Sequence, residues 1–247
     1  MSVQYPQTGQ GQGDTPHRVF TSITQFFGER CGRNDDQQSL TRAPSLLRTA
    51  CVGNPERTIQ GELFAYLKQR HAHVVLEYRL HSFKLHPIGE WPEGRSIDIM
   101  VLDDAFMPAC AVELKHLGRM QGEVGALLVG LEEDWKRFES VDVPLILVGV
   151  YTDISSLPPG RTRTDFEAFR FISCYAFHKD GRPKRLKSDC DATHNIGHGR
   201  LEKWAKQYCD PFVTSFCGVP EKFWTPAGPV TGRVHYFVGL TSTQTRR

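Results

Sequence analysis

Two short apolar segments of the sequence, SIDIMV and AVELK, carry charged residues in places where charge is costly. Asp98 lies in the middle of the first segment, and Glu113 and Lys115 end the second. In a β-strand, residues two apart project from the same face, so Glu113 and Lys115 lie together on the face opposite to Leu114. Charges among Ile, Val and Leu are unfavourable unless they are paired or bound to a metal. The spacing therefore predicts that Asp98, Glu113 and Lys115 share one hydrophilic site that holds a divalent cation.

This set of side chains suits the hydrolysis of phosphodiester bonds. Two carboxylates from neighbouring strands can bind Mg²⁺, which prefers oxygen ligands and keeps some of its waters. The ion makes its water a better nucleophile and neutralises charge on a phosphate oxygen. Lys115 can position or deprotonate that water and stabilise the developing negative charge. A further carboxylate at Glu62, on the edge of an apolar helical stripe, would bind a second ion or orient the water.

The surrounding pattern predicts the elements that must position these residues. The predicted elements are a helix from Thr58, strands at Val74–Leu80, Ile97–Leu102 and Cys110–Lys115, a helix from Val124 to Phe138, and a strand at Leu145–Val150. The last strand is an uninterrupted apolar run, which suits a strand buried on both faces and paired in parallel across a one-helix crossover. The order helix, three strands, helix, strand predicts an α/β fold with a mixed sheet and helices on both sides.

Outside this core, the sequence predicts three further parts. Residues 1–16, rich in Gln, Gly, Thr and Pro, are expected to form a disordered leader, and residues 17–57 an N-terminal helical segment with helical spacing from His17 to Cys31. The core then covers 58–153. Residues 154–247 form a C-terminal extension, which either extends the sheet or builds a small appended lobe. Its predicted elements are strands at Arg170–Phe177 and Val234–Leu240 and a helix at Arg200–Tyr208.

Composition limits the class of protein. The chain has 247 residues, 39% of them hydrophobic, and a formal net charge of only +2, so any nucleic-acid surface must be local. No stretch of eighteen apolar residues exists, and the first residues lack the basic start and apolar run of a signal peptide. The seven cysteines are odd in number and widely spaced, which is typical of reduced cytoplasmic proteins.

The charged residues also resemble a known active site. Glu62 on a helix, Asp98 on the second strand and Glu113-Leu114-Lys115 on the third resemble the PD-(D/E)XK superfamily, the restriction-endonuclease-like nucleases. The family shares the order helix, three strands, helix, strand, in a three-layer αβα core. The resemblance covers roughly residues 58–153, under half of the chain. The residue before Asp98 is isoleucine rather than proline, as in many members of the family.

The resemblance implies a role for each residue. Asp98 and Glu113 would be the ligands of Mg²⁺ or Mn²⁺, and the backbone carbonyl of Leu114 would complete that side of the ion. Lys115 would act on the attacking water, and Glu62 would assist. The E-x-K triplet alone carries little information, because it occurs by chance in many proteins; the ordered set on successive elements is more specific.

A basic segment in the C-terminal extension offers a surface for nucleic acid. Residues 161–187 hold eight Lys or Arg against three Asp or Glu, and the densest part contains Arg182, Lys184, Arg185 and Lys187. Such a basic turn can bind nucleic-acid phosphates with little sequence preference. The alternative is an ordinary solvated loop.

The favoured function is therefore a metal-dependent nuclease, with DNA as the expected partner and an endonuclease as the expected type. Cutting both strands of a duplex calls for two sites, which favours a homodimer. One alternative within the nuclease class is an interbacterial toxin or a defence effector. The other alternative is a non-catalytic binding protein on the same fold, in which Glu113 and Lys115 form a strand-end salt bridge and Asp98 caps a turn.

Overall fold

The computed structural model describes residues 15–31, 34–35, 45–50, 54–79, 95–117, 121–138, 141, 143–156, 175–177, 183–185, 203–204, 206–209, 213–216, 221–225 and 228–241. The helices are α1 Thr15–Arg30, α2 Leu46–Ala50, α3 Pro55–Lys68 and α4 Gln121–Arg137. The strands are β1 Asn34–Asp35, β2 His73–Tyr78, β3 Ile97–Leu102, β4 Pro108–Leu117, β5 Leu145–Ser156, β6 Tyr175–Phe177, β7 Pro183–Arg185, β8 Val213–Phe216, β9 Glu221–Thr225 and β10 Gly228–Leu240. From α3 to β5 the order is helix, three strands, helix, strand, as the sequence predicts.

The strands form an open mixed sheet. Its order is β1-β9-β10-β5-β4-β3-β2, and β8 also pairs with β10. The β4–β5 pair is parallel, which confirms the predicted crossover through one helix, whereas β2, β3 and β4 pair antiparallel to one another. The long strand β10 runs antiparallel along β5 and contains the predicted strand Val234–Leu240. The fold is therefore mixed α/β, and the sheet continues across the predicted core boundary near residue 153.

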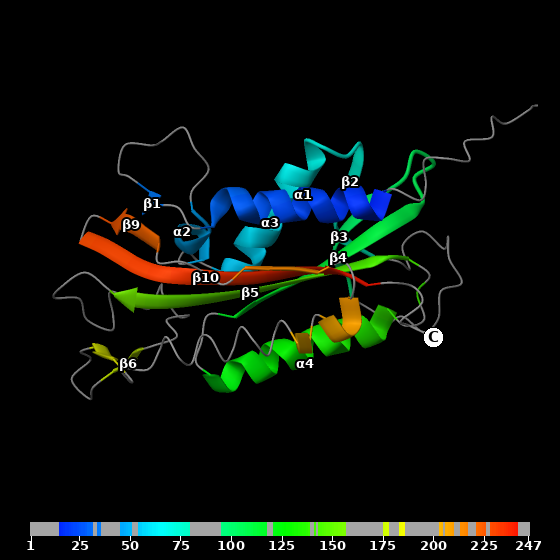
Figure 1. Cartoon of the computed structure of the whole chain (residues 1–247). Helices are drawn as coiled ribbons and strands as arrows, with labels where there is room; N and C mark the ends of the chain where they lie inside the picture. The colour runs from blue at the N-terminus through cyan, green and yellow to red at the C-terminus, as the bar shows by residue number, and fades with distance from the viewer. Residues whose placement is uncertain are drawn as a thin grey trace, which may run out of the picture.

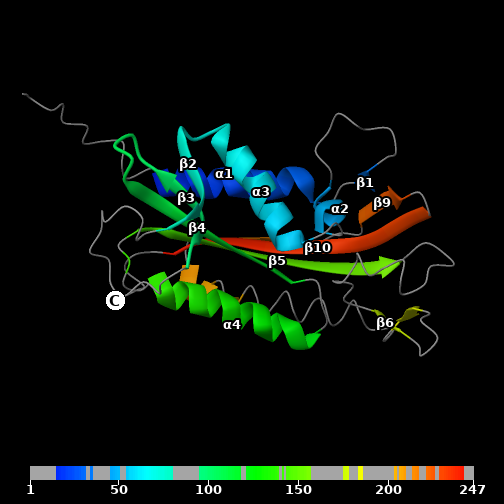
Figure 2. The same cartoon turned by 180° about the vertical axis from the view of Figure 1, so that it is seen from behind.

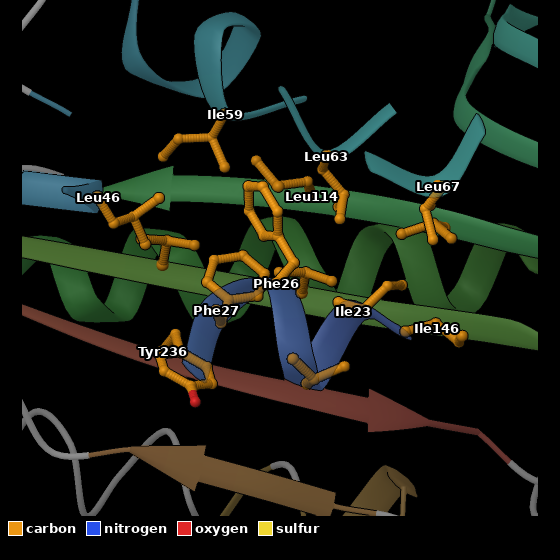
Figure 3. Packing of buried hydrophobic residues seen from close by; sticks show 14 of the residues in the cluster. Ile23, Phe26, Phe27, Leu46, Ile59, Leu63, Leu67, Leu114, Ile146 and Tyr236 are labelled. Atoms are coloured by element: carbon orange, nitrogen blue, oxygen red, sulfur yellow. The ribbon is translucent and has the colours of Figure 1, made fainter. Parts of the chain in front are cut away.

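Helices lie on both faces of this sheet, with α1 and α3 on one side and α4 on the other (Figures 1 and 2). The apolar side of α1, with Val19, Ile23, Phe26 and Phe27 buried, matches the predicted helix from His17 to Cys31. These side chains pack with residues of α3 and of the central strands in one large cluster that includes Leu114 (Figure 3).

The start of α3 lies three residues before the predicted one. Asn54 caps the helix by accepting a hydrogen bond from the backbone N–H of Arg57 at 3.4 Å, and Pro55 occupies the first turn. Both residue types are preferred at these positions, because asparagine satisfies an unpaired N–H and proline has none to satisfy. The earlier start places Glu56 in the first helical turn.

Several predictions fall partly outside the described residues. The leader predicted for 1–16 lies outside them except for Thr15 and Pro16, which begin α1. Lys184 and Arg185 lie in β7, which pairs with β6, whereas Arg182 and Lys187 are outside the described residues. Of the helix predicted at Arg200–Tyr208, residues 203–204 and 206–208 are described and are helical. In the described part of the chain, no helix is long and apolar enough to cross a membrane.

Candidate functional site

Asp98 lies at the point where β3 separates from β4. The last paired residues are Ile99 and Val112. One residue beyond them, Oδ2 of Asp98 accepts a hydrogen bond from the backbone N–H of Leu114 at 2.7 Å. The Asp98 carboxylate therefore replaces the β3 backbone as the partner of β4. Since the N–H and C=O of one strand residue project to the same edge, the Leu114 carbonyl faces the same gap.

Glu113 and Lys115 both face α4, as the strand periodicity predicts, because Leu114 between them is buried in the core on the opposite face. The side chain of Lys115 forms an ion pair with Asp134 of α4, with Nζ 3.2 Å from Oδ2. Arg137 of α4 also pairs with Asp134, and its Nη2 lies 3.9 Å from Oε1 of Glu113. The ion pair of Lys115 is thus with α4 rather than with its strand neighbour Glu113.

The carboxyls of Asp98 and Glu113 are electrostatically coupled. Glu113 is 2% exposed, and burial raises its pKa well above the usual range. The negative charge of Asp98 and a hydrogen bond between the two carboxyls raise it further, while Arg137 and Lys115 oppose the shift. Burial also raises the pKa of Asp98, against the opposing effects of the Leu114 N–H and Lys115. Two such close carboxyls hold a proton more readily than isolated ones.

Two further residues, Gln60 and Glu77, surround Asp98 and were missed by the sequence analysis. The buried Gln60 of α3 directs its Nε2 at Oδ1 of Asp98 (3.3 Å), at the Asp98 carbonyl (3.1 Å) and at Oε1 of Glu77 (3.1 Å). Glu77 of β2 also accepts a hydrogen bond from the Ser96 hydroxyl, which lowers its pKa. Its φ of 51° is unusual for a residue other than glycine, and such backbone conformations cluster at functional sites.

Glu56, in the first turn of α3, is the third residue that the sequence analysis missed. Its Oε2 accepts a hydrogen bond from the backbone N–H of His116 at 3.0 Å, and its charge contributes to the raised pKa of Asp98. The signal for it was the Asn-Pro pair at 54–55, which starts the helix early enough to include it. His116 itself contacts Oγ1 of Thr152 at 3.0 Å, and burial lowers the pKa of its imidazole to about 3.

Glu62 does not join the other predicted residues, which corrects that prediction. Its carboxylate pairs with Arg30 of α1, and the Thr49 hydroxyl lies 3.3 Å from its Oε2. Glu62 follows Gln60 by two residues, about 200° around a helix of 3.6 residues per turn. Since Gln60 points at Asp98, the same helix must direct Glu62 away from it. The acidic residue that α3 contributes to the site is Glu56.

A divalent cation needs oxygen ligands, and the candidates for them here are Asp98, Glu113 and the Leu114 carbonyl. Among the described residues, no group of three or more His, Cys, Asp or Glu side chains is arranged to hold a metal. The carboxyls of Asp98 and Glu113 lie close to each other at the strand gap, beside the backbone of Leu114. Oε1 of Glu113 is buried and receives no hydrogen bond from the residues described, although the Arg137 guanidinium lies 3.9 Å away. A partial set of oxygen ligands suits Mg²⁺, which usually keeps several waters.

The geometry therefore brings together Asp98, Glu113, the Leu114 carbonyl and, on the α4 side, Lys115. It replaces Glu62 by Glu56 and adds Gln60 and Glu77 around Asp98. When the chain is compared with models of protein families, with curated proteins and with solved structures, nothing matches it.

Proposed function

We propose that the protein is a metal-dependent nuclease that hydrolyses phosphodiester bonds on a three-layer αβα core similar to that of the PD-(D/E)XK superfamily. The observation that carries the proposal is the gap between β3 and β4, where Asp98 bonds to the backbone of Leu114 beside Glu113. The element order from α3 to β5 and the Lys115 side chain on the Glu113 face support the same proposal.

In this proposal, Asp98, Glu113 and the Leu114 carbonyl hold Mg²⁺ or Mn²⁺. The bound ion supplies charge neutralisation at the phosphate and a more acidic water. Gln60 and the Leu114 N–H fix the orientation of the Asp98 carboxylate from two directions.

Lys115 supplies the positive charge that stabilises the anionic transition state. Asp134 pairs with its ammonium group from the α4 side. The Lys115 side chain is 28% exposed, so a phosphate can approach it from solvent.

We expect DNA as the substrate and an endonuclease as the type of enzyme. Of the basic segment, Lys184 and Arg185 lie in a two-stranded sheet, β6–β7, that is separate from the main sheet. Basic residues outside the main sheet suit contacts to phosphates that are remote from the cut. A homodimer would place one site on each strand of a duplex.

The test is incubation of the purified chain with plasmid, linear duplex, single-stranded DNA and RNA, each with Mg²⁺ or with EDTA. We expect cleavage with Mg²⁺ alone, and a loss of about 100-fold or more in Asp98→Asn and in Lys115→Ala. Glu133→Gln and Lys136→Gln, which change exposed charges on α4, are the matched controls and should cleave like the parent.

Calorimetric titration with Mn²⁺ tests the site without relying on activity. The parent should bind the ion, and Asp98→Asn should not. Undiminished Mg²⁺-dependent cleavage in both Asp98→Asn and Lys115→Ala would refute the site. Absence of both cleavage and Mn²⁺ binding in the parent would favour a non-catalytic binding protein.

A further inference from the structure

Three residues on one face of α4 lie against the charged side chains of β4. Gly130, Asp134 and Arg137 follow one another at spacings of four and three residues, which places them on the same face of a helix. The helix packs on the side of the sheet opposite to α1 and α3 (Figures 1 and 2). Its contacts there are with Glu113 and Lys115. This face of α4 therefore belongs to the surroundings of the proposed cation site.

The side chain of Lys115 passes along α4 to a buried carboxylate. Its aliphatic part runs past Gly130 at contact distance, since a Cβ at that position would lie 3.8 Å from its Cδ and Cε. Its ammonium group ends 3.2 Å from Oδ2 of Asp134, whose side chain is 4% exposed. Asp134 is thus a fixed anchor for the charge of Lys115.

Arg137 lies between two carboxylates and contacts them at different distances. Its guanidinium pairs closely with Oδ1 of Asp134, whereas Lys115 pairs with Oδ2. The same guanidinium has its Nη2 3.9 Å from Oε1 of Glu113, beyond the range of about 2.7–3.2 Å for a hydrogen bond. That oxygen is buried and receives no hydrogen bond from the residues described. Arg137 therefore has a close partner in Asp134 and a distant one in Glu113.

This position of Arg137 opposes a metal ion at Glu113. A guanidinium group does not lose its proton in proteins, so its charge repels any cation that binds the same carboxylate. Asp134 changes the balance, because it keeps a buried negative charge beside Arg137 when the guanidinium is no longer near Glu113. The arginine is therefore not left without an anion, which would be strongly unfavourable at a side chain that is only 18% exposed.

We infer that Arg137 is the resident counter-ion of Glu113, that a divalent cation takes its place there, and that Asp134 then retains the guanidinium. This inference rests on the cation site of the proposed function and adds the regulation of that site: Arg137 opposes the ion and Asp134 favours it. Both are positioning residues, which act through Glu113 and Lys115.

Calorimetric titration of the full-length protein with Mn²⁺ tests the role of Arg137. Arg137→Gln should bind the ion more tightly by about fivefold or more, which is the effect of unit charges about 4 Å apart even at the dielectric constant of water. Arg137→Lys, which keeps the positive charge, should bind with nearly the parent affinity. Lys136→Gln removes an exposed charge from the neighbouring position and should stay within twofold of the parent.

Asp134→Asn should have the opposite effect on the same titration. Without Asp134, the guanidinium has Glu113 as its remaining carboxylate in this group, so Mn²⁺ should bind about fivefold or more weakly. Glu132→Gln, which removes an exposed negative charge from the same helix, is the control and should stay within twofold. Urea unfolding shows whether each variant is folded. A merely structural role predicts weaker binding in both Asp134→Asn and Arg137→Gln.

The double variant Asp134→Asn with Arg137→Gln tests whether the two residues act on each other. Removal of the arginine should raise the affinity for Mn²⁺ more in the Asp134→Asn protein than in the parent, because Arg137 then competes for Glu113 without an alternative partner. Residues in one network of ion pairs show such non-additive effects. Equal gains in the two backgrounds would contradict the role given to Asp134.

Cleavage assays separate this inference from the proposed function. In Arg137→Gln, the Mg²⁺ concentration that gives half-maximal cleavage should fall by about the same factor as the Mn²⁺ dissociation constant. If the parent binds Mn²⁺ but cleaves nothing, the nuclease function fails and the titrations still decide the inference. The inference is overturned if neither the parent nor Arg137→Gln binds Mn²⁺, if Arg137→Gln binds within twofold of the parent or more weakly, or if Lys136→Gln gains as much affinity.

Discussion

Two groups of charged side chains in this structure, one around Arg30 and Glu62 and one around Asp98 and Glu113, are neutralised in different ways. On the α1 side, Arg30 pairs with Glu62, and Thr49 accepts a hydrogen bond from Arg30 at 2.9 Å while contacting the Glu62 carboxylate. That group holds one cation, one carboxylate and a hydroxyl that joins them. Around Asp98 and Glu113, the carboxyls outnumber the cations that can neutralise them.

In the group around Asp98 and Glu113, the contacts show which carboxyls and which cations take part. Its acidic members come from five elements and are Glu56, Glu77, Asp98, Glu113 and Asp134. Among the described residues, the cations that act on Asp98 and Glu113 are Lys115 and Arg137. Both cations pair with Asp134, and Arg137 also lies 3.9 Å from Glu113. Burial nevertheless raises the pKa of both Asp98 and Glu113. We therefore expect the Arg30–Glu62 group to support the fold and the Asp98–Glu113 group to be destabilising until a proton or a cation joins it.

The largest effect on stability is expected when the ion pair between Arg30 and Glu62 is broken. Glu62→Gln leaves the guanidinium of Arg30, whose side chain is 6% exposed, without its anionic partner. Because Glu62 itself is 30% exposed, the loss in the free energy of unfolding should be about 2–3 kcal/mol, below the value for a fully buried pair. Urea unfolding measures it.

The same variant should cleave nucleic acid at the parent rate per folded molecule, because Glu62 points away from Asp98. Glu132→Gln, which breaks the exposed pair with Lys136, is the control and should cost less than about 1 kcal/mol. A loss of cleavage in folded Glu62→Gln would return that residue to the active site and remove the distinction between the two groups.

A divalent cation should stabilise the protein through the Asp98–Glu113 group and not through the Arg30–Glu62 group. At a concentration of about 100 times its dissociation constant, Mg²⁺ or Mn²⁺ should add about 2.7 kcal/mol to the free energy of unfolding of the parent. Glu113→Gln should lose this gain because one of the two carboxylates is missing, whereas Glu62→Gln should keep it in full. Urea unfolding with and without the ion measures both. An equal gain in Glu113→Gln would place the cation elsewhere.

The sequence predicts Asp98, Glu113 and Lys115 because strand periodicity is a local property. Each of these residues alternates with apolar ones, and the burial of Leu114 in the core is enough to fix the faces of its neighbours. Helix periodicity gives less information about Glu62. It places the residue on the edge of a stripe, but the partner that packs there, Arg30 of α1, depends on how two helices meet.

The residues that α4 adds could have been predicted in part. The stripe of that helix includes Leu131 and Phe138, and Asp134 lies three residues after the first and four before the second, on the same buried side. A carboxylate at this position requires a cationic partner, and Lys115 of β4 supplies one. Gln60 gives no such signal, because its contact with Asp98 arises from the packing of α3 against β3.

The smallest expected effect on stability is also the most direct test of the Asp98–Glu113 group, and it depends on pH. The pKa of Glu113 is raised in the folded chain, so its contribution to stability is present below the unfolded pKa of about 4.3 and is lost as the pH rises through the folded pKa. Glu113→Gln cannot ionise and escapes this loss. In EDTA at pH 8 the variant should therefore be more stable than the parent by about 1 kcal/mol or more, and the advantage should vanish toward pH 4.

The measurement is urea unfolding of both proteins from pH 4 to pH 8. His116 has the opposite sign, since its lowered pKa gives stability that is present above about pH 6.5 and is lost as the pH falls toward 3, but it is common to both proteins and cancels in the difference. Arg137 keeps Asp134 as a partner in the variant, so no cation is left alone. If Glu113→Gln were instead less stable at pH 8, as Glu62→Gln is expected to be, Glu113 would be a net stabilising partner of Arg137. The two groups would then be alike, and the argument that the carboxyls at the strand gap lack a neutralising cation would fail.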